Sequence, residues 1–274
     1  MRFSPVLTEL GTYPFAHVAE EKRRVAAIGT SVIDFGPGDP SEPTAEFIRR
    51  ALADGIRDTM DYPRAAGLPE LRVAIASWIE RRFGVELDAD SEVIPTLGVK
   101  EAIFSFAQIV LDPPRGKNLV VTTEPGYPVP ERGARFAGAE VVQLPLLERN
   151  GFLPDLDAVD PAVWQRAAVV WVNYPNNPTG ATAPLSLYER LAALAEEHDF
   201  LVASDEAYSE LWFDEPPTSG LQAADRSRLV VFNSLSKRSS MTGYRAGFVA
   251  GSPEVVAALR LFRPSVGTTP QEFV

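Results

Sequence analysis

From about residue 68 onward, helical patterns alternate with short apolar runs rich in β-branched residues. Parallel strands need long crossover connections, which helices usually supply, so this alternation indicates a mostly parallel sheet with helices on both faces. The sequence therefore predicts an α/β fold of three layers, helix, sheet and helix. Strands are expected at residues 119–123, 141–144, 168–172, 200–203, 229–232 and 244–250.

Three helices can be placed from local signals. The first spans 68–83, where the apolar residues form a single stripe. The second spans 187–198 and is expected to begin with a capping box, in which Ser186 is the N-cap and Glu189 lies three residues further on. The third follows residues 252–254, whose serine is the expected N-cap and whose proline takes the first helical position.

The composition excludes several kinds of site and partner. Acidic residues outnumber basic ones by 37 to 26, and the net charge of −11 argues against nucleic acid or an anionic membrane as a partner. Because the chain has no cysteine, disulfides, zinc–thiolate centres and thiol nucleophiles are excluded, and we expect no metal site. The sequence shows no membrane-spanning run and no signal-peptide pattern, so we expect a cytoplasmic protein.

Chemically distinctive residues follow three of the expected strands. They are residues 173–180 (NYPNNPTG), 204–208 (SDEAY) and 233–238 (NSLSKR), and residues 243–247 (GYRAG) open the next strand. Each segment also has an ordinary structural interpretation, as a rigid turn, a helix cap, a surface lysine or an edge salt bridge. Ligand sites in parallel sheets lie beyond the carboxyl ends of the strands, however, so the segments are expected to meet at one edge.

These segments, in this order, resemble the class I/II aminotransferases of fold type I, which depend on pyridoxal 5′-phosphate (PLP). The resemblance covers nearly all of the 274 residues. It implies that Lys237 holds the cofactor covalently and later moves the substrate α-proton. It also implies that Asp205 keeps a proton on the pyridine nitrogen, while Asn177 and Tyr208 bind the phenolic oxygen of the ring.

The resemblance assigns further residues to the phosphate, the ring and the substrate. The phosphate would be bound by the helix start at Gly98, Val99 and Lys100, by the Ser234 hydroxyl and by the Arg245 guanidinium. Tyr62 would reach the phosphate of a partner subunit. Tyr127 would stack on the ring, although a core tyrosine is the alternative interpretation. Gly38 would lie beside the substrate carboxylate, and Asn177 would also bind the substrate.

The resemblance also predicts the domain organisation. Residues 1–40 would form an N-terminal arm that belongs to the small domain, and residues 41–274 the large PLP-binding domain. Family members continue with a C-terminal part of the small domain that carries the arginine gripping the substrate carboxylate, and this sequence offers no residue for that role. We therefore expect PLP binding with weak transamination.

The predicted activity is transfer of an amino group between an amino acid and a 2-oxo acid, by a homodimer. Residues 150–155, 209–215 and 234–251 look most like succinyldiaminopimelate aminotransferases of lysine biosynthesis, which suggests N-succinyl-diaminopimelate and 2-oxoglutarate as substrates. The same scaffold hosts C–S lyases, decarboxylases and racemases, so these remain alternatives. A PLP-binding protein without catalytic activity is another.

Overall fold

The computed structural model describes residues 2–11, 14–34, 36, 38–267 and 269–274. The chain divides into two compact units, Met1–Glu42 and Pro43–Val274. The smaller unit contains two helices, α1 (Pro5–Glu9) and α2 (Pro14–Ala27). Its boundary lies close to the one predicted at residue 40, but the assignment of these residues to an arm of a small domain stays a prediction.

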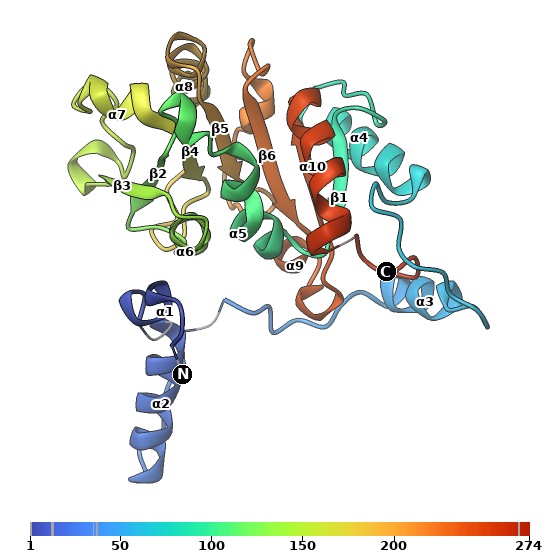
Figure 1. Cartoon of the computed structure of the whole chain (residues 1–274). Coiled ribbons are helices and arrows are strands. Elements are labelled where there is room, and N and C mark those ends of the chain that lie inside the picture. The colour runs from blue at the N-terminus through green and yellow to red at the C-terminus, as the bar shows by residue number, and fades with distance from the viewer. Residues whose placement is uncertain (1, 12–13, 35, 37, 268) are drawn as a thin grey trace. The chain divides into compact units, whose positions relative to one another are not determined.

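The larger unit is built on a seven-stranded sheet with the strand order β1-β7-β6-β5-β4-β2-β3 (Figure 1). The strands from β2 to β6 run parallel to their neighbours, whereas β7 is antiparallel to both β6 and β1. The mostly parallel sheet predicted from the sequence is therefore confirmed. The strands are β1 (Val93–Thr96), β2 (Leu119–Glu124), β3 (Glu140–Pro145), β4 (Ala167–Asn173), β5 (Leu201–Asp205), β6 (Leu229–Ser234) and β7 (Gly247–Gly251).

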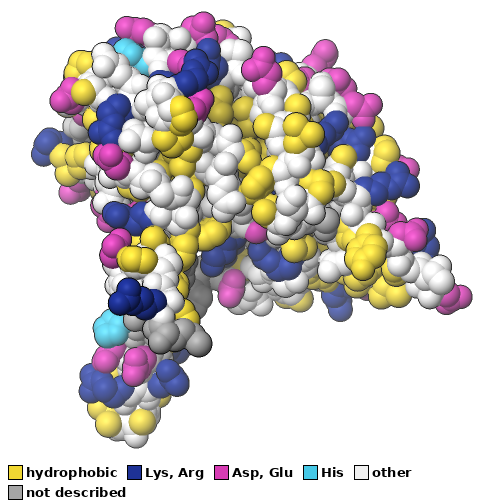
Figure 2. Space-filling view, viewed as in Figure 1, with side chains coloured by type: hydrophobic (Ala, Val, Ile, Leu, Met, Phe, Trp, Pro, Cys, Tyr) yellow, Lys and Arg dark blue, Asp and Glu magenta, His cyan; other side chains and the backbone are white. Residues whose placement is uncertain are grey.

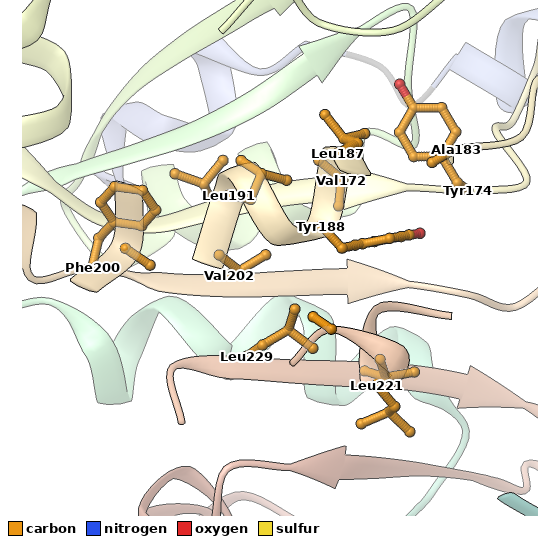
Figure 3. Packing of buried hydrophobic residues seen from close by; sticks show 14 of the residues in the cluster. Val172, Tyr174, Ala183, Leu187, Tyr188, Leu191, Phe200, Val202, Leu221 and Leu229 are labelled. Atoms are coloured by element: carbon orange, nitrogen blue, oxygen red, sulfur yellow. The ribbon is translucent and has the colours of Figure 1, made fainter. Parts of the chain in front are cut away.

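Helices cover both faces of this sheet, because alternate strand residues point to opposite sides. In β4, Val170 and Val172 belong to one core, and Val169 and Trp171 belong to the other. The first core includes α4 (Pro69–Phe83), α7 (Pro161–Arg166) and α8 (Leu185–His198), and Figure 3 shows α8 packed over the neighbouring strands. The second core includes α5 (Val99–Val110), α6 (Val129–Phe136) and α10 (Pro253–Val266).

Short helices complete the unit. They are α3 (Glu46–Gly55), α9 (Leu235–Arg238) and the 3-10 turns η1 (Pro113–Arg115), η2 (Glu148–Asn150), η3 (Gly220–Gln222) and η4 (Thr242–Tyr244). Of the helices described, none is long and apolar enough to cross a bilayer. Acidic and basic side chains are interspersed over the face of the molecule in view in Figure 2.

Three sequence predictions need correction. The capping box at Ser186 is wrong, because Pro184 is the N-cap of α8 and Ser186 already lies in the first turn. The strand predicted at 244–250 begins only at Gly247, because Arg245 has a φ of 58° and this left-handed conformation interrupts an extended chain. The sequence analysis also missed β1, which at four residues is too short to give a clear periodic signal.

The strand pairing gathers the chemically distinctive segments at one edge. The last residue of β6, Ser234, is paired with the first residue of β7, Gly247, and Gly247 is also paired with Thr96 at the end of β1. Asn173 and Asp205, the last residues of β4 and β5, are paired with each other. This edge, which we call the carboxyl edge, therefore joins the ends of four strands, β1, β4, β5 and β6, and the start of β7.

Candidate active site

Asp205 is the buried acid of the carboxyl edge. It ends β5 and is only 4% exposed, and its carboxyl group accepts one hydrogen bond among the described residues, from the Ala207 backbone N–H at 3.2 Å. Burial raises the pKa of its carboxyl from 3.8 to about 7, since desolvation disfavours the charged form and the Ala207 N–H only partly offsets it. A carboxyl group in this situation is ready to bind a cationic or proton-bearing group.

A small pocket lies over Asp205, and Tyr127 lines it together with Thr122, Thr123 and Trp171. Tyr127 follows β2, so its ring comes from a different strand end than the carboxyl group. An aromatic side chain and a buried acid in one pocket suit a flat heteroaromatic ring that carries a basic nitrogen. The structure thus brings together two residues that were predicted to hold the same ring.

Asn173 ties this pocket to the following turn. Its side-chain N–H group donates to the Asp205 backbone carbonyl at 2.9 Å, and its amide oxygen accepts from the Asn177 backbone N–H at 2.9 Å. Asn177, predicted to bind both the ring and the substrate, is therefore held beside the Asp205 strand. Asn173 itself was not assigned a role, although its place as the last residue of an apolar strand was a usable signal.

Asn233 makes the equivalent link on the other side of Asp205. This asparagine is 1% exposed, and its side-chain N–H group donates to the Glu206 backbone carbonyl at 3.2 Å and to the Ser209 hydroxyl at 3.0 Å. The half-buried Tyr208 lies within the turn that these bonds hold. Two buried asparagines thus fix the turn after β5 from both neighbouring strands, and neither role was predicted.

Lys237 lies in α9, directly after β6. Ser234 caps this helix by accepting from the Ser236 backbone N–H at 3.1 Å, and Lys237 is half-buried. On the neighbouring residue, the Arg238 guanidinium lies 4.0 Å from the centre of the Trp78 ring, and burial lowers the pKa of Arg238. Packing of Arg238 against α4 therefore anchors the short helix that carries the predicted covalent lysine.

Gly98 and Arg245 form a compact cradle at the start of α5. Gly98 is the N-cap of α5, with a φ of 68°, and a side chain added there would collide with the Arg245 guanidinium. An added Cβ at Gly247 would come within 3.1 Å of the Val99 backbone nitrogen, which places the helix start beside Ser234, the partner of Gly247. A helix N-terminus, a hydroxyl and a guanidinium in this arrangement suit an anion such as a phosphate.

Lys100, Tyr62 and Gly38 are the remaining predicted site residues. Lys100 is exposed in the first turn of α5, so its predicted contribution is the backbone amide. The Tyr62 side chain is 96% exposed and does not line the pocket over Asp205. Gly38 belongs to the smaller unit, Met1–Glu42.

Glu206 is a second buried acid that sequence reasoning missed. It is fully buried, and one carboxylate oxygen accepts from the Ser204 hydroxyl at 3.0 Å and from the Gly220 backbone N–H at 2.8 Å. Burial raises its pKa to about 7, and the neighbouring Asp205 charge adds to this effect. Its partners join β5 to η3, so we interpret Glu206 as a structural link behind the site.

The described residues therefore fit a ligand with an aromatic ring, a basic ring nitrogen and a phosphate. The acid of Asp205 and the aromatic side chain of Tyr127 suit the ring, and the cradle at Gly98 suits the phosphate. No group of three or more potential ligands for a metal ion occurs in the part of the chain that the structure describes.

Comparison with known proteins gives consistent results. Residues 30–270 match the family model for aminotransferase class I and II. The chain is 42% identical over 258 residues to an LL-diaminopimelate aminotransferase of Nitratidesulfovibrio vulgaris, covering 92% of this chain and 66% of the relative. It thus spans about two thirds of the length of the curated relatives it matches.

Solved structures agree with this similarity. An aminotransferase from Neisseria meningitidis has 36% identity and a TM-score of 0.91, covering 99% of this chain and 71% of that one. A structure from Thermus thermophilus described as a probable N-succinyldiaminopimelate aminotransferase has 31% identity and a TM-score of 0.87, covering 94% of this chain and 70% of that one.

Proposed function

The chain belongs to the class I and II aminotransferases, and we propose on this basis that it binds PLP at the carboxyl edge and takes part in transamination. The observation that carries the proposal is the buried Asp205 carboxyl in a pocket shared with Tyr127. Desolvation raises the pKa of this carboxyl group, and a positively charged partner would stabilise its ionised form. A protonated pyridine nitrogen is such a partner.

When bound, PLP supplies an electron-withdrawing ring that stabilises the negative charge left on an amino acid after loss of its α-proton. Asp205 would hold the proton on the ring nitrogen, and Tyr127 would pack on the ring face. Asn177 and Tyr208 would hydrogen-bond the phenolic oxygen. Lys237 would anchor the cofactor covalently, and its amine, once released by the substrate, would move the proton at the α-carbon as base and then as acid.

The phosphate would be held by the Gly98 cradle. The Val99 and Lys100 backbone N–H groups belong to the first turn of α5, and N–H groups at a helix start are natural phosphate donors. The Ser234 hydroxyl and the Arg245 guanidinium would complete the set. Gly98 is required here because any larger residue would displace Arg245.

We further propose a homodimer, in which the exposed Tyr62 reaches the phosphate of the partner subunit. The supporting observation is that this large aromatic side chain is 96% exposed and is therefore accessible to a second subunit. Sedimentation equilibrium tests the assembly. PLP titration of Tyr62→Phe and Tyr62→Ala then tests the phosphate contact, because loss of the hydroxyl alone should weaken binding if the contact is real.

For the substrate, we propose an amino acid of the diaminopimelate type. The related aminotransferases are named for LL-diaminopimelate at 42% identity and for N-succinyldiaminopimelate at 31%, which favours the free diamino acid over the succinylated form predicted from the sequence. Both compounds carry a carboxylate far from the reacting amine, so the site must accept a long dianionic or zwitterionic side chain.

Three measurements on the purified chain test the proposal. Borohydride reduction followed by peptide mapping should find the pyridoxyl label on Lys237, and a label elsewhere would contradict the anchor. The visible absorption of the bound cofactor should shift on adding LL-diaminopimelate, more than on adding its N-succinyl derivative. Formation of glutamate from 2-oxoglutarate would show transamination, whereas pyruvate and ammonia without an acceptor would indicate a lyase.

A further inference from the structure

Arg263 and Glu101 form an ion pair behind the Gly98 cradle. The Arg263 guanidinium belongs to α10, and its Nη1 atom lies 2.7 Å from Oε1 of Glu101 in the first turn of α5. Arg263 is only 1% exposed, although α10 ends near the surface. The pair joins two helices on the same face of the sheet that come from segments 162 residues apart (Figure 1).

The same oxygen of Glu101 holds the backbone of the cradle. Oε1 also accepts from the Leu97 backbone N–H at 3.3 Å, and Leu97 directly precedes the Gly98 N-cap. This resembles the reciprocal half of a capping box, in which the third helical residue reaches back to the chain before the helix. The orientation of Glu101 therefore determines how the loop between β1 and α5 presents its amides.

Glu101 also creates an electrostatic difficulty for a phosphate site. A carboxylate in the first turn stabilises an isolated helix, because it interacts favourably with the positive end of the helix dipole. At a helix start that must bind a phosphate dianion, however, the same charge repels the ligand. A nearby cation is needed if Glu101 is to keep its structural bond without weakening anion binding.

We propose that Arg263 is a positioning residue that neutralises Glu101 and orients it on the Leu97 N–H, so that the start of α5 can bind the cofactor phosphate. The inference rests on the proposed PLP site. Arg263 acts through Glu101 and needs no contact with the cofactor. Its burial matters because a desolvated guanidinium is not screened by solvent and keeps one fixed geometry.

The test compares PLP with pyridoxal, which lacks the phosphate, on the full chain. Arg263→Met should weaken PLP binding about tenfold, the size expected for one poorly screened charge near an anion at a helix start, and should change pyridoxal binding little. Adding Glu101→Gln to this variant should restore PLP binding, since glutamine can still accept from Leu97 but carries no charge. Cofactor absorbance and quenching of tryptophan fluorescence give both dissociation constants.

Two further variants keep the test decisive. Arg228→Met removes an arginine that is paired with Glu196 and Asp199 at the opposite edge of the sheet, and it should leave the ratio of PLP to pyridoxal affinity unchanged. If Arg263→Met does not fold, Glu101→Gln in the unmodified background serves instead, and it should tighten PLP binding severalfold without affecting pyridoxal.

The outcomes separate the inference from the proposed function. If the unmodified chain binds no PLP, the proposed function fails. If it binds PLP but Arg263→Met weakens PLP and pyridoxal equally, and Glu101→Gln restores neither, then the pair only holds α5 to α10 and the positioning role is overturned. Equal PLP affinity in Arg263→Met and the unmodified chain would overturn it as well.

Discussion

Replacing Asp205 by asparagine should stabilise the cofactor-free protein at alkaline pH and leave it nearly unchanged in strong acid. The side chain is 4% exposed, and its carboxyl has a pKa raised from 3.8 to about 7 by desolvation. Asparagine has the same shape and can still accept the Ala207 N–H, but it cannot ionise. The substitution therefore removes the buried charge and little else.

The sign and size of this pH-dependent change in stability follow from proton linkage. Because the folded-state pKa is raised, the folded protein binds the Asp205 proton more tightly than the unfolded chain does, so stability falls as pH rises from about 4 to about 7 and stays low above that. A shift of about three units corresponds to about 4 kcal/mol when complete. Between pH 5 and pH 8.5, the stability of the variant relative to the unmodified chain should increase by about 2–3 kcal/mol.

Urea unfolding of the cofactor-free chain at pH 5, 7 and 8.5 measures this difference. Asp214→Asn is a suitable control, because Asp214 is exposed and its replacement should give a flat profile. With saturating PLP, the unmodified chain should be more stable than the variant, because PLP supplies a cationic partner for Asp205 and not for the asparagine. A relative stability that is the same at pH 5 and pH 8.5 would refute the buried-carboxylate interpretation.

The other predictions concern cofactor binding and geometry. Arg245→Ala should weaken PLP binding by about ten- to a hundredfold with less effect on pyridoxal, which paired titrations measure, and unchanged PLP affinity would exclude a phosphate role. Gly98→Ala should weaken PLP binding similarly, because the added side chain would displace the Arg245 guanidinium. Gly116→Ala is the control: this glycine also has a positive φ, but the space around it is open, so PLP binding should not change. Asn233→Ala should lower the free energy of unfolding in urea by about 1–3 kcal/mol, since the Asn233 side chain bonds to Glu206 and Ser209 and holds the turn after β5. It should also slow the reaction of Lys237 with PLP, measured by trapping the product with borohydride, and an unchanged rate would contradict this link.

The sheet and the positions of the main site residues could be predicted because they depend on local sequence. Short apolar runs marked the strands β4, β5 and β6, and each was followed by its motif. Once the strands were taken as parallel, Asp205, Asn177 and Lys237 had to meet at one edge. The pairing of Asn173 with Asp205 and of Ser234 with Gly247 shows the physical basis of that argument.

The missed features depend on contacts between distant segments. The pairing of Glu101 with Arg263 has no local pattern, since the partners come from α5 and α10. The left-handed conformation at Arg245 was equally hidden, because arginine rarely adopts it and only the tertiary structure enforces it. Polar strand-end residues such as Asn233 were visible in the sequence, but what they would bind was not.

Two adjacent acids at the end of β5 show how the structure separates a functional carboxyl group from a structural one. Both are buried, and both have a pKa raised to about 7, so neither burial nor pKa distinguishes them. Their surroundings do. Glu206 accepts from the Ser204 hydroxyl and the Gly220 N–H, which are protein groups that link β5 to η3, and its second carboxylate oxygen is buried without a hydrogen-bond partner among the described residues. The Asp205 carboxyl accepts from the Ala207 N–H and lines a pocket with Tyr127, which Glu206 does not line. A ligand can supply a partner only to an acid that faces such a pocket, so we propose Asp205 rather than Glu206 as the acid of the site.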